Sequence, residues 1–214
     1  MISGKAYLLD FDGTIANTVR CITATMHETF RQMGFAPEQI PSYDAMVETI
    51  GLPLLGALKG LGNLDDERAQ YATDLYRQIF KTLEKETIEI FPHVAETIKE
   101  LHRQGKRLAI VTSRNYPSLE RILQYHGLFN YFEEFMTNTP GIAPKPAPDM
   151  VNILLERMGL RPEDAIVIGD TTFDIEMGNR AGCRTIAVTY GNHSREKLCT
   201  ASPTQIIDSF DQLL

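Results

Sequence analysis

Apolar and polar residues follow two patterns along this chain. Short, mainly apolar runs occupy 6–9, 107–112, 165–169 and 184–189, with a weaker run at 132–136. Such runs lack polar alternation, which predicts strands buried on both faces of a parallel sheet. Apolar residues at helical spacing separate them, over 94–104, 118–126, 147–158 and 173–181. We therefore predict an α/β fold with a Rossmann-like, doubly wound parallel sheet.

The first predicted strand is followed by about ninety residues of almost pure helical pattern. A helix starting near Ile15 ends at Gly34, and further helices are predicted over 42–50, 54–61 and 65–85. This stretch is too long for a simple crossover between neighbouring strands. We predict a small α-helical cap domain inserted at 16–86, and a core domain made of 1–15 and 87–214.

The composition is that of an ordinary soluble globular protein. The chain has 214 residues, of which 43% are hydrophobic and 23% charged, and its net charge is −7. An acidic chain does not attract nucleic acid, and no apolar run is long enough to span a membrane. The N-terminus leads directly into the first strand without a secretory pattern, so we expect a cytoplasmic protein.

The cysteines and histidines are not expected to form a metal site. The three cysteines, at 21, 183 and 199, share no ligand spacing and are expected to be reduced thiols. The five histidines are scattered as well, and we expect them to be structural or exposed.

Side chains that could take part in a reaction follow the ends of the predicted strands. In doubly wound sheets ligands bind beyond the carboxyl ends of the strands, so side chains that follow different strands meet at one edge. The residues that follow the strands are, in order, Asp10 and Asp12, then Thr112, Ser113 and Arg114, then Lys145, and finally Asp170 and Asp174. For Arg114, the sequence leaves open whether the side chain faces the substrate or the solvent.

This set of side chains predicts phosphoryl transfer. Carboxylates close together repel one another and need a bound cation, and hard oxygen ligands select Mg²⁺. A hydroxyl from Thr112 and a cation from Lys145 complete what such a reaction needs. Taken singly, Thr112 is an ordinary strand-end hydroxyl and Lys145 a solvated lysine. Their joint occurrence at strand ends favours a site.

Four segments in this order resemble the haloacid dehalogenase superfamily, and the resemblance covers the whole chain. The segments are Asp10-Phe11-Asp12-Gly13-Thr14, Val111-Thr112-Ser113, Lys145-Pro146 and Gly169-Asp170-Thr171-Thr172-Phe173-Asp174. The predicted insert falls where this family carries a small helical cap. The stretch from Gly127 to Asp149 looks like the branch of phosphoglycolate phosphatases and β-phosphoglucomutases.

The resemblance implies a role for each matching residue. Asp10 would attack phosphorus and become an aspartyl phosphate, and Asp12 would protonate the leaving oxygen and then activate water. An acid two residues after the nucleophile favours phosphate chemistry over displacement of halide from carbon.

The remaining matching residues would bind the metal and the phosphate. Mg²⁺ would be held by the Asp10 carboxylate, the Asp12 backbone carbonyl and Asp170, and supported directly or through water by Asp174. Thr112, Ser113 and Lys145 would bind the phosphoryl oxygens.

The sequence defines the substrate less well than it defines the reaction. Gly51-Leu52-Pro53-Leu54 looks like the cap loop that reaches toward the site, and it lacks the arginine usual in β-phosphoglucomutases. Asn17-Thr18 stands where the family often has Asp-Ser. We expect hydrolysis of a small phosphorylated metabolite such as phosphoglycolate or a sugar phosphate. The alternatives are a pyrophosphatase, a β-phosphoglucomutase-like phosphotransferase and a non-catalytic phosphate-binding regulatory protein.

Overall fold

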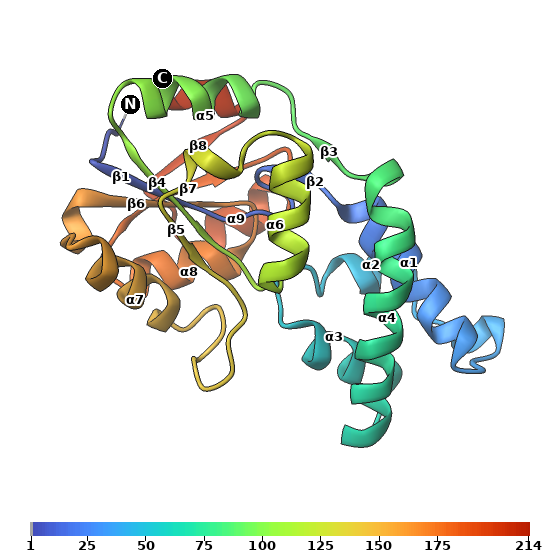
Figure 1. The fold of residues 1–214 in the computed structure, drawn as a ribbon. Coiled ribbons are helices and arrows are strands. Elements are labelled where there is room, and N and C mark those ends of the chain that lie inside the picture. Colours follow the sequence, from blue (N-terminus) through green and yellow to red (C-terminus); the bar gives the residue numbers. More distant parts are fainter. Residues whose placement is uncertain (1) are drawn as a thin grey trace.

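The computed structural model describes residues 2–214, and all of their side chains except those of 85 and 86. Its centre is a six-stranded parallel sheet with the strand order β5-β4-β1-β6-β7-β8 (Figure 1). This confirms the predicted α/β class. The strands are β1 (Ala6–Leu9), β4 (Arg107–Val111), β5 (Glu134–Met136), β6 (Ala165–Gly169), β7 (Arg184–Val188) and β8 (Gln205–Ile207).

Both faces of the sheet are covered, which explains why its strands read as unbroken apolar runs. Along β1, Ala6 and Leu8 pack in one apolar cluster, and Tyr7 and Leu9 pack in another on the opposite face. The first cluster includes side chains of α7 (Asp149–Met158) and α8 (Thr172–Arg180). The second includes side chains of α5 (Val94–Arg103) and α6 (Tyr116–Tyr125).

Four helices precede α5 in the segment between β1 and β4, and they form a separate group beside the sheet (Figure 1). They are α1 (Val19–Gln32), α2 (Tyr43–Val47), α3 (Leu54–Gly62) and α4 (Asp66–Thr87). The chain enters and leaves this group through an antiparallel pair, β2 (Ala16–Asn17) with β3 (Glu89–Ile90). The second strand of this pair begins three residues after the predicted end of the cap at 86, and the division at 16–86 stays a proposal.

Some element boundaries differ from the sequence-based ranges. The first helix begins at Val19 and not near Ile15, because Ala16–Asn17 form β2. Helix α6 begins at Tyr116 rather than at 118, because the Asn115 side chain accepts a hydrogen bond from the Ser118 N–H at 3.1 Å. Strand β5 is shorter than 132–136, because 129–131 forms a 3₁₀ turn before it. Helix α9 (Arg195–Thr200) and strand β8 were not predicted.

The strand order determines where a ligand can bind. Strand β1 pairs with β4 on one side and with β6 on the other, so the winding of the sheet reverses at β1. The crevice beyond the carboxyl end of β1 is therefore the expected binding position. Within residues 2–214, no helix combines the length and the apolar character needed to cross a membrane.

Candidate active site

All the sequence-predicted site residues lie at the carboxyl edge of the sheet. Asp10 and Asp12 follow β1, Thr112 and Ser113 follow β4, and Lys145 lies in the loop between β5 and α7. Asp170 follows β6, and Asp174 lies in the first turn of α8. All except Ser113 are buried. The expectation that strand ends gather these side chains therefore agrees with the geometry.

Lys145 is the centre of this arrangement. Its Nζ donates to Asp10 Oδ1 at 2.6 Å and to Asp174 Oδ1 at 2.5 Å. The side chain is fully buried. Burial alone would lower the pKa of Lys145, but the two carboxylates outweigh it and raise the pKa above its usual value. Lys145 is thus held as a cation against Asp10, and it is not a solvated loop lysine.

Three carboxylates surround one point beside Lys145. Oxygen atoms of Asp10, Asp170 and Asp174 all lie within 4.8 Å of one another, and all three side chains are buried. Burial raises the pKa of Asp10 well above its usual value, although Lys145 opposes this. Burial, with Asp174 adding to it, raises the pKa of Asp170 to about 7. Clustered buried carboxylates of this kind fit a hard divalent cation, because a cation would relieve their repulsion.

Hydrogen bonds fix the two acids that follow β6. Asp170 accepts from Thr14 Oγ1 at 3.0 Å through one oxygen, and from the Asn192 N–H and Nδ2 at 2.8 Å through the other. Asp174 Oδ2 accepts from the N–H and the hydroxyl of Thr171, at 3.1 and 2.6 Å. Both Asp174 oxygens are therefore engaged by the protein, which would suit a supporting position beside a cation bound by the other two acids.

Thr14, Thr171 and Asn192 were not singled out in the sequence. Thr14 and Thr171 lie inside matched motifs, so attention to each motif's own hydroxyl groups would have found them. Asn192 lies in the loop after β7, and extending the strand-end rule to that strand would have found it.

Gly13 allows the backbone after β1 to pass close to the side chains that follow β6 and β7. Its φ is +90°, and a Cβ placed there would lie 2.1 Å from Asp170 Oδ2 and 2.3 Å from Asn192 Nδ2. No larger side chain fits between these atoms, and the backbone conformation itself favours glycine. The sequence Asp12-Gly13 is thus a close backbone passage, and it is not a hairpin turn.

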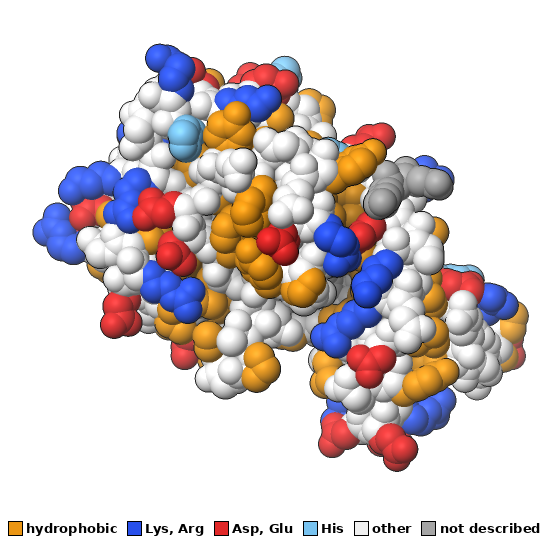
Figure 2. All heavy atoms as spheres, in the orientation of Figure 1, with side chains coloured by type: hydrophobic (Ala, Val, Ile, Leu, Met, Phe, Trp, Pro, Cys, Tyr) orange, Lys and Arg blue, Asp and Glu red, His pale blue; other side chains and the backbone are white. Residues whose placement is uncertain are grey.

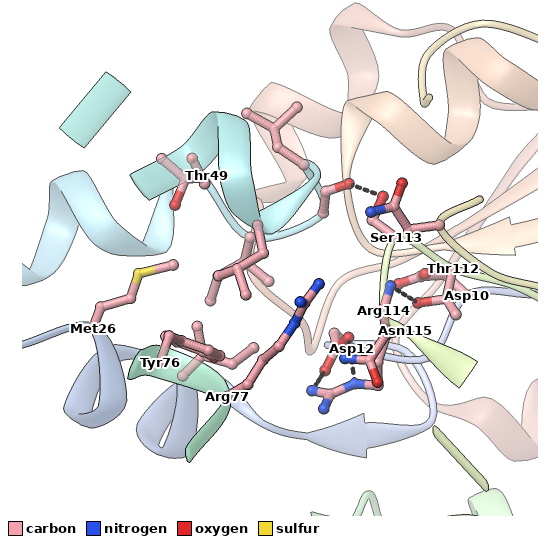
Figure 3. A pocket seen from close by; sticks show the side chains of 17 residues that line it. Asp10, Asp12, Met26, Thr49, Tyr76, Arg77, Thr112, Ser113, Arg114 and Asn115 are labelled. Carbon is pink, nitrogen blue, oxygen red and sulfur yellow. Dashed lines mark hydrogen bonds and ion pairs between the residues drawn. The ribbon is translucent and has the colours of Figure 1, made fainter. Parts of the chain in front are cut away.

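Asp12 is paired with Arg114, which the sequence left undecided between substrate and solvent. Arg114 Nε donates to Asp12 Oδ2 at 3.0 Å, and Nη2 donates to Oδ1 (Figure 3). Its Nη1 donates to Ser118 Oγ at 2.8 Å. The guanidinium carbon lies 4.9 Å from the ring centre of Phe80 on α4 and 5.5 Å from that of Phe11. Arg114 is therefore a buried partner of Asp12, clamped between the core and the inserted helices.

A pocket opens between these residues and the inserted helices (Figure 3). The core side of it presents Asp10, Asp12, Thr112, Ser113, Arg114 and Asn115. The opposite side is formed mainly by apolar side chains, Ile22, Met26, Ile50, Leu52, Leu54 and Ala57. The Ser113 hydroxyl donates to the carbonyl of Gly51 at 2.6 Å, which ties the two sides together. The loop of 51–54 does reach the site, as its resemblance to a cap loop implies.

With this geometry in hand, the chain can be compared with known proteins. Residues 7–188 match the family model of the haloacid dehalogenase-like hydrolases. This match spans most of the chain, and the chain therefore belongs to the haloacid dehalogenase-like hydrolase family. The resemblance drawn from the four motifs is confirmed.

Several curated relatives match nearly the full chain. A phosphoglycolate phosphatase of Vibrio vulnificus is 29% identical over 98% of this chain and 94% of its own length. The Dickeya dadantii protein named "Probable phosphatase IndB" is 32% identical, over 97% of this chain and 90% of its own. Pyrophosphatase PpaX of Halalkalibacterium halodurans is 30% identical, with 97% and 94% covered.

Solved structures share the fold. A haloacid dehalogenase-like family hydrolase from Streptococcus pneumoniae superposes with a TM-score of 0.83 at 24% identity, covering 95% of this chain and 93% of the other. A hydrolase from Pseudomonas syringae gives a TM-score of 0.85 at 20% identity, with 97% and 95% covered. At these identities the likeness concerns the fold alone.

Proposed function

We propose that this chain is a Mg²⁺-dependent phosphatase of small phosphomonoesters that works through an aspartyl phosphate on Asp10. The observation that carries the proposal is the contact of the Asp10 carboxylate with Lys145, beside Asp170 and Asp174, at the floor of a pocket. The relatives named as phosphatases support the same reaction class.

Asp10 is the nucleophile in this proposal. The contact with Lys145 keeps one oxygen fixed, and the backbone N–H of Asp10 donates to the carbonyl of Ile168 at 2.9 Å, so the residue cannot swing away. A fixed carboxylate that faces the pocket can attack phosphorus in line with the leaving oxygen. The bond from phosphorus to the alcohol oxygen breaks as the bond to Asp10 forms.

Asp12 moves the proton. It lies at the pocket wall, two residues from Asp10, and both of its oxygens accept from Arg114 in this structure. To protonate the leaving oxygen, Asp12 has to give up at least one of these contacts. In the second half of the reaction it takes a proton from the water that attacks the phosphorus of the aspartyl phosphate.

Thr112, Ser113 and Lys145 are proposed to bind the phosphoryl oxygens, Ser113 through its backbone N–H because its hydroxyl donates to the carbonyl of Gly51. Thr112 is buried and lines the pocket, and its Oγ1 accepts from the Arg114 N–H at 3.2 Å, which leaves its own proton free to donate. Lys145 offers the compact positive charge that phosphate binding needs.

The metal site is proposed to consist of the carboxylates of Asp10 and Asp170 and the backbone carbonyl of Asp12, with Asp174 in support. Bound Mg²⁺ would supply positive charge that offsets the charge of the phosphoryl group and of the acids. Asp170 accepts three hydrogen bonds from Thr14 and Asn192, which leaves one lone pair on Oδ1 for a metal ion.

Pyrophosphate is a second candidate substrate, because a relative at 30% identity is named a pyrophosphatase. The same core groups would act on it, since only the leaving group differs. A mutase has less support, because the cap loop of 51–54 lacks the arginine that is usual in β-phosphoglucomutases.

The test is a screen for released phosphate. Small phosphomonoesters and pyrophosphate are offered to the wild type with Mg²⁺, to the wild type with chelator, and to Asp10→Asn. We expect turnover only in the first arm, with a loss in Asp10→Asn of roughly a thousandfold or more. Turnover that persists in Asp10→Asn would refute the nucleophile, and turnover that resists chelation would refute the metal.

A further inference from the structure

A groove continues from the active-site pocket and runs between α4 of the insert and α6 of the core. It is lined by Arg77, Lys81 and Phe80 from α4 and by Pro117, Ser118 and Arg121 from α6. Tyr76, Arg77, Arg114 and Asn115 line both the groove and the pocket, so the two spaces join. In Figure 2, blue side chains line the seam between the core and the inserted helices.

Two of the cations near this groove are already neutralised. Arg114 is paired with Asp12. Arg121 donates to both oxygens of the buried Glu84, at 2.8 and 3.0 Å. Each pair leaves little net charge for a ligand, because the guanidinium and the carboxylate cancel at short range.

Arg77 and Lys81 carry the surplus charge. Arg77 reaches Asp74 only at 3.4 Å, and both side chains are about half exposed. Lys81 is exposed and makes no ion pair with any side chain that the structure describes. The two residues are one helical turn apart on α4, so they lie on the same face of the helix. Figure 3 shows the Arg77 side chain extending from α4 into the space in front of Asp12 and Arg114.

The rest of the molecule makes this local charge informative. The chain carries a net charge of −7, which weakly repels anionic substrates. The phosphoryl group is served by residues at the far side of the pocket, on the sheet edge. Among the side chains of the insert that the structure describes, Arg77 is the charged one that lines the pocket. A second cationic position on that side is therefore aimed at the part of the substrate that leaves.

We propose that Arg77, assisted by Lys81, binds a second anionic group carried by the leaving group of the substrate. This inference rests on the proposed phosphatase function and narrows it. The substrates would be compact phosphomonoesters whose alcohol also carries a carboxylate or a second phosphate. Such a group would lie in the mouth of the groove while the ester phosphate lies at Asp10.

Matched esters test the proposal. Values of kcat/KM are measured with saturating Mg²⁺ for three esters. In 2-phosphoglycolate and ethylene glycol bisphosphate the leaving group carries a second anionic group, and in 2-hydroxyethyl phosphate the leaving group is uncharged. We expect the wild type to prefer an anionic ester. The ratio of anionic to uncharged ester should fall about tenfold in Arg77→Gln, and by less in Lys81→Gln, because one charged contact to a partly exposed group is lost. Arg77→Lys should recover part of the ratio.

Arg20→Gln is the matched control. Arg20 is an exposed arginine on α1 that does not line the pocket or the groove, so its loss should leave the ratio unchanged. Which anionic ester is preferred identifies a carboxylate or a phosphate as the bound group. Circular dichroism melting of each variant excludes a folding defect as the cause.

The proposal is overturned if the wild type shows no preference for either anionic ester, or if the ratio is the same in Arg77→Gln as in the wild type. Failure of the proposed function looks different. In that case none of the three esters would release phosphate in a manner that depends on Asp10.

Discussion

The two sides of the pocket are built in different ways. On the core side, Asp10, Lys145 and Asp174 are buried and joined by contacts of 2.5 to 2.6 Å. On the side of the insert, Leu52 is partly exposed and Arg77 about half exposed, and both line the pocket. On the proposed function, the chemistry would depend on strand ends that the sheet fixes. The choice of substrate would depend on helix faces that can vary without disturbing the sheet.

Substitution of the buried Lys145 should cause the largest loss of both stability and activity. In Lys145→Met, the buried Asp10 and Asp174 lose their common partner, and an uncompensated buried charge costs about 3–5 kcal/mol of unfolding free energy. Phosphate release should fall by at least about a hundredfold, since the charge that faces the phosphoryl group is lost. Urea unfolding and a phosphate assay measure the two effects.

Lys99→Met is the control for this substitution, because Lys99 is exposed on α5 and should tolerate the change. If Lys145→Met unfolded at the same urea concentration as the wild type, Lys145 would not be what balances the acids.

Arg114 joins the two sides, so its substitution should give an intermediate effect. Arg114→Gln removes the contacts to Asp12 and the packing beneath Phe80. We expect kcat/KM to fall about tenfold to a hundredfold for an alkyl phosphate, whose alcohol needs a proton to leave. The fall should be smaller for p-nitrophenyl phosphate, whose phenolate leaves without one.

Arg114→Lys keeps the charge and should recover part of the loss. Equal losses on both esters would show that Arg114 acts on the phosphate or on the fold, and that it does not act through Asp12.

The acid cluster makes the core side sensitive to pH in a way that the insert is not. In the metal-free protein the pKa of Asp170 is raised by burial to about 7, above its value of about 3.9 in the unfolded chain. Between these values the folded state binds the extra proton, so stability falls as pH rises toward 7. Mg²⁺ would bind the acids in their ionised form, so its stabilising effect should grow over the same interval.

Thermal melting with and without MgCl₂ at pH 5.5, 6.5 and 7.5 measures this effect. We expect the shift in Tm on adding Mg²⁺ to increase with pH. A shift that is constant or decreases with pH would contradict the assignment of these carboxylates to the cation.

Substitution on the insert side should give the smallest effect and change preference rather than chemistry. Leu52→Ala removes apolar contact area from the pocket wall, and we expect changes in kcat/KM of less than about tenfold that differ from one alcohol to another. Leu55→Ala is the control, since Leu55 is an exposed neighbour that does not line the pocket. A uniform large loss with Leu52→Ala would mean that this loop takes part in the chemistry.

The sequence predicted the core side well, for a physical reason. Asp10, Thr112 and Asp170 follow apolar runs that can only be buried parallel strands, and parallel strands bring their ends to one edge. Short and partly exposed elements lack that signal. Strand β8 has three residues at the sheet edge, and α9 has six, so neither shows a readable period.

Contacts between segments that are distant in the chain could not be predicted from the sequence. The pairing of Asp12 with Arg114 spans 102 positions, and that of Asp170 with Asn192 depends on a loop without regular structure. In the sequence, Arg77 is one of several charged residues in the predicted helix of 65–85. Only the packing of α4 against the core places it at the pocket.

The most direct test of the account is to trap phosphate on Asp10. In Asp12→Asn, p-nitrophenyl phosphate can still phosphorylate the enzyme, because its leaving group needs no proton. Water attack on the intermediate should be slow, because its base is missing.

Rapid mixing with Mg²⁺ should then give a burst of nitrophenolate of about one equivalent per active site. Mass spectrometry of the acid-quenched protein should place the phosphate on the peptide that contains Asp10. Phosphate found on another residue, or turnover with no covalent phosphate and no burst, would contradict the account.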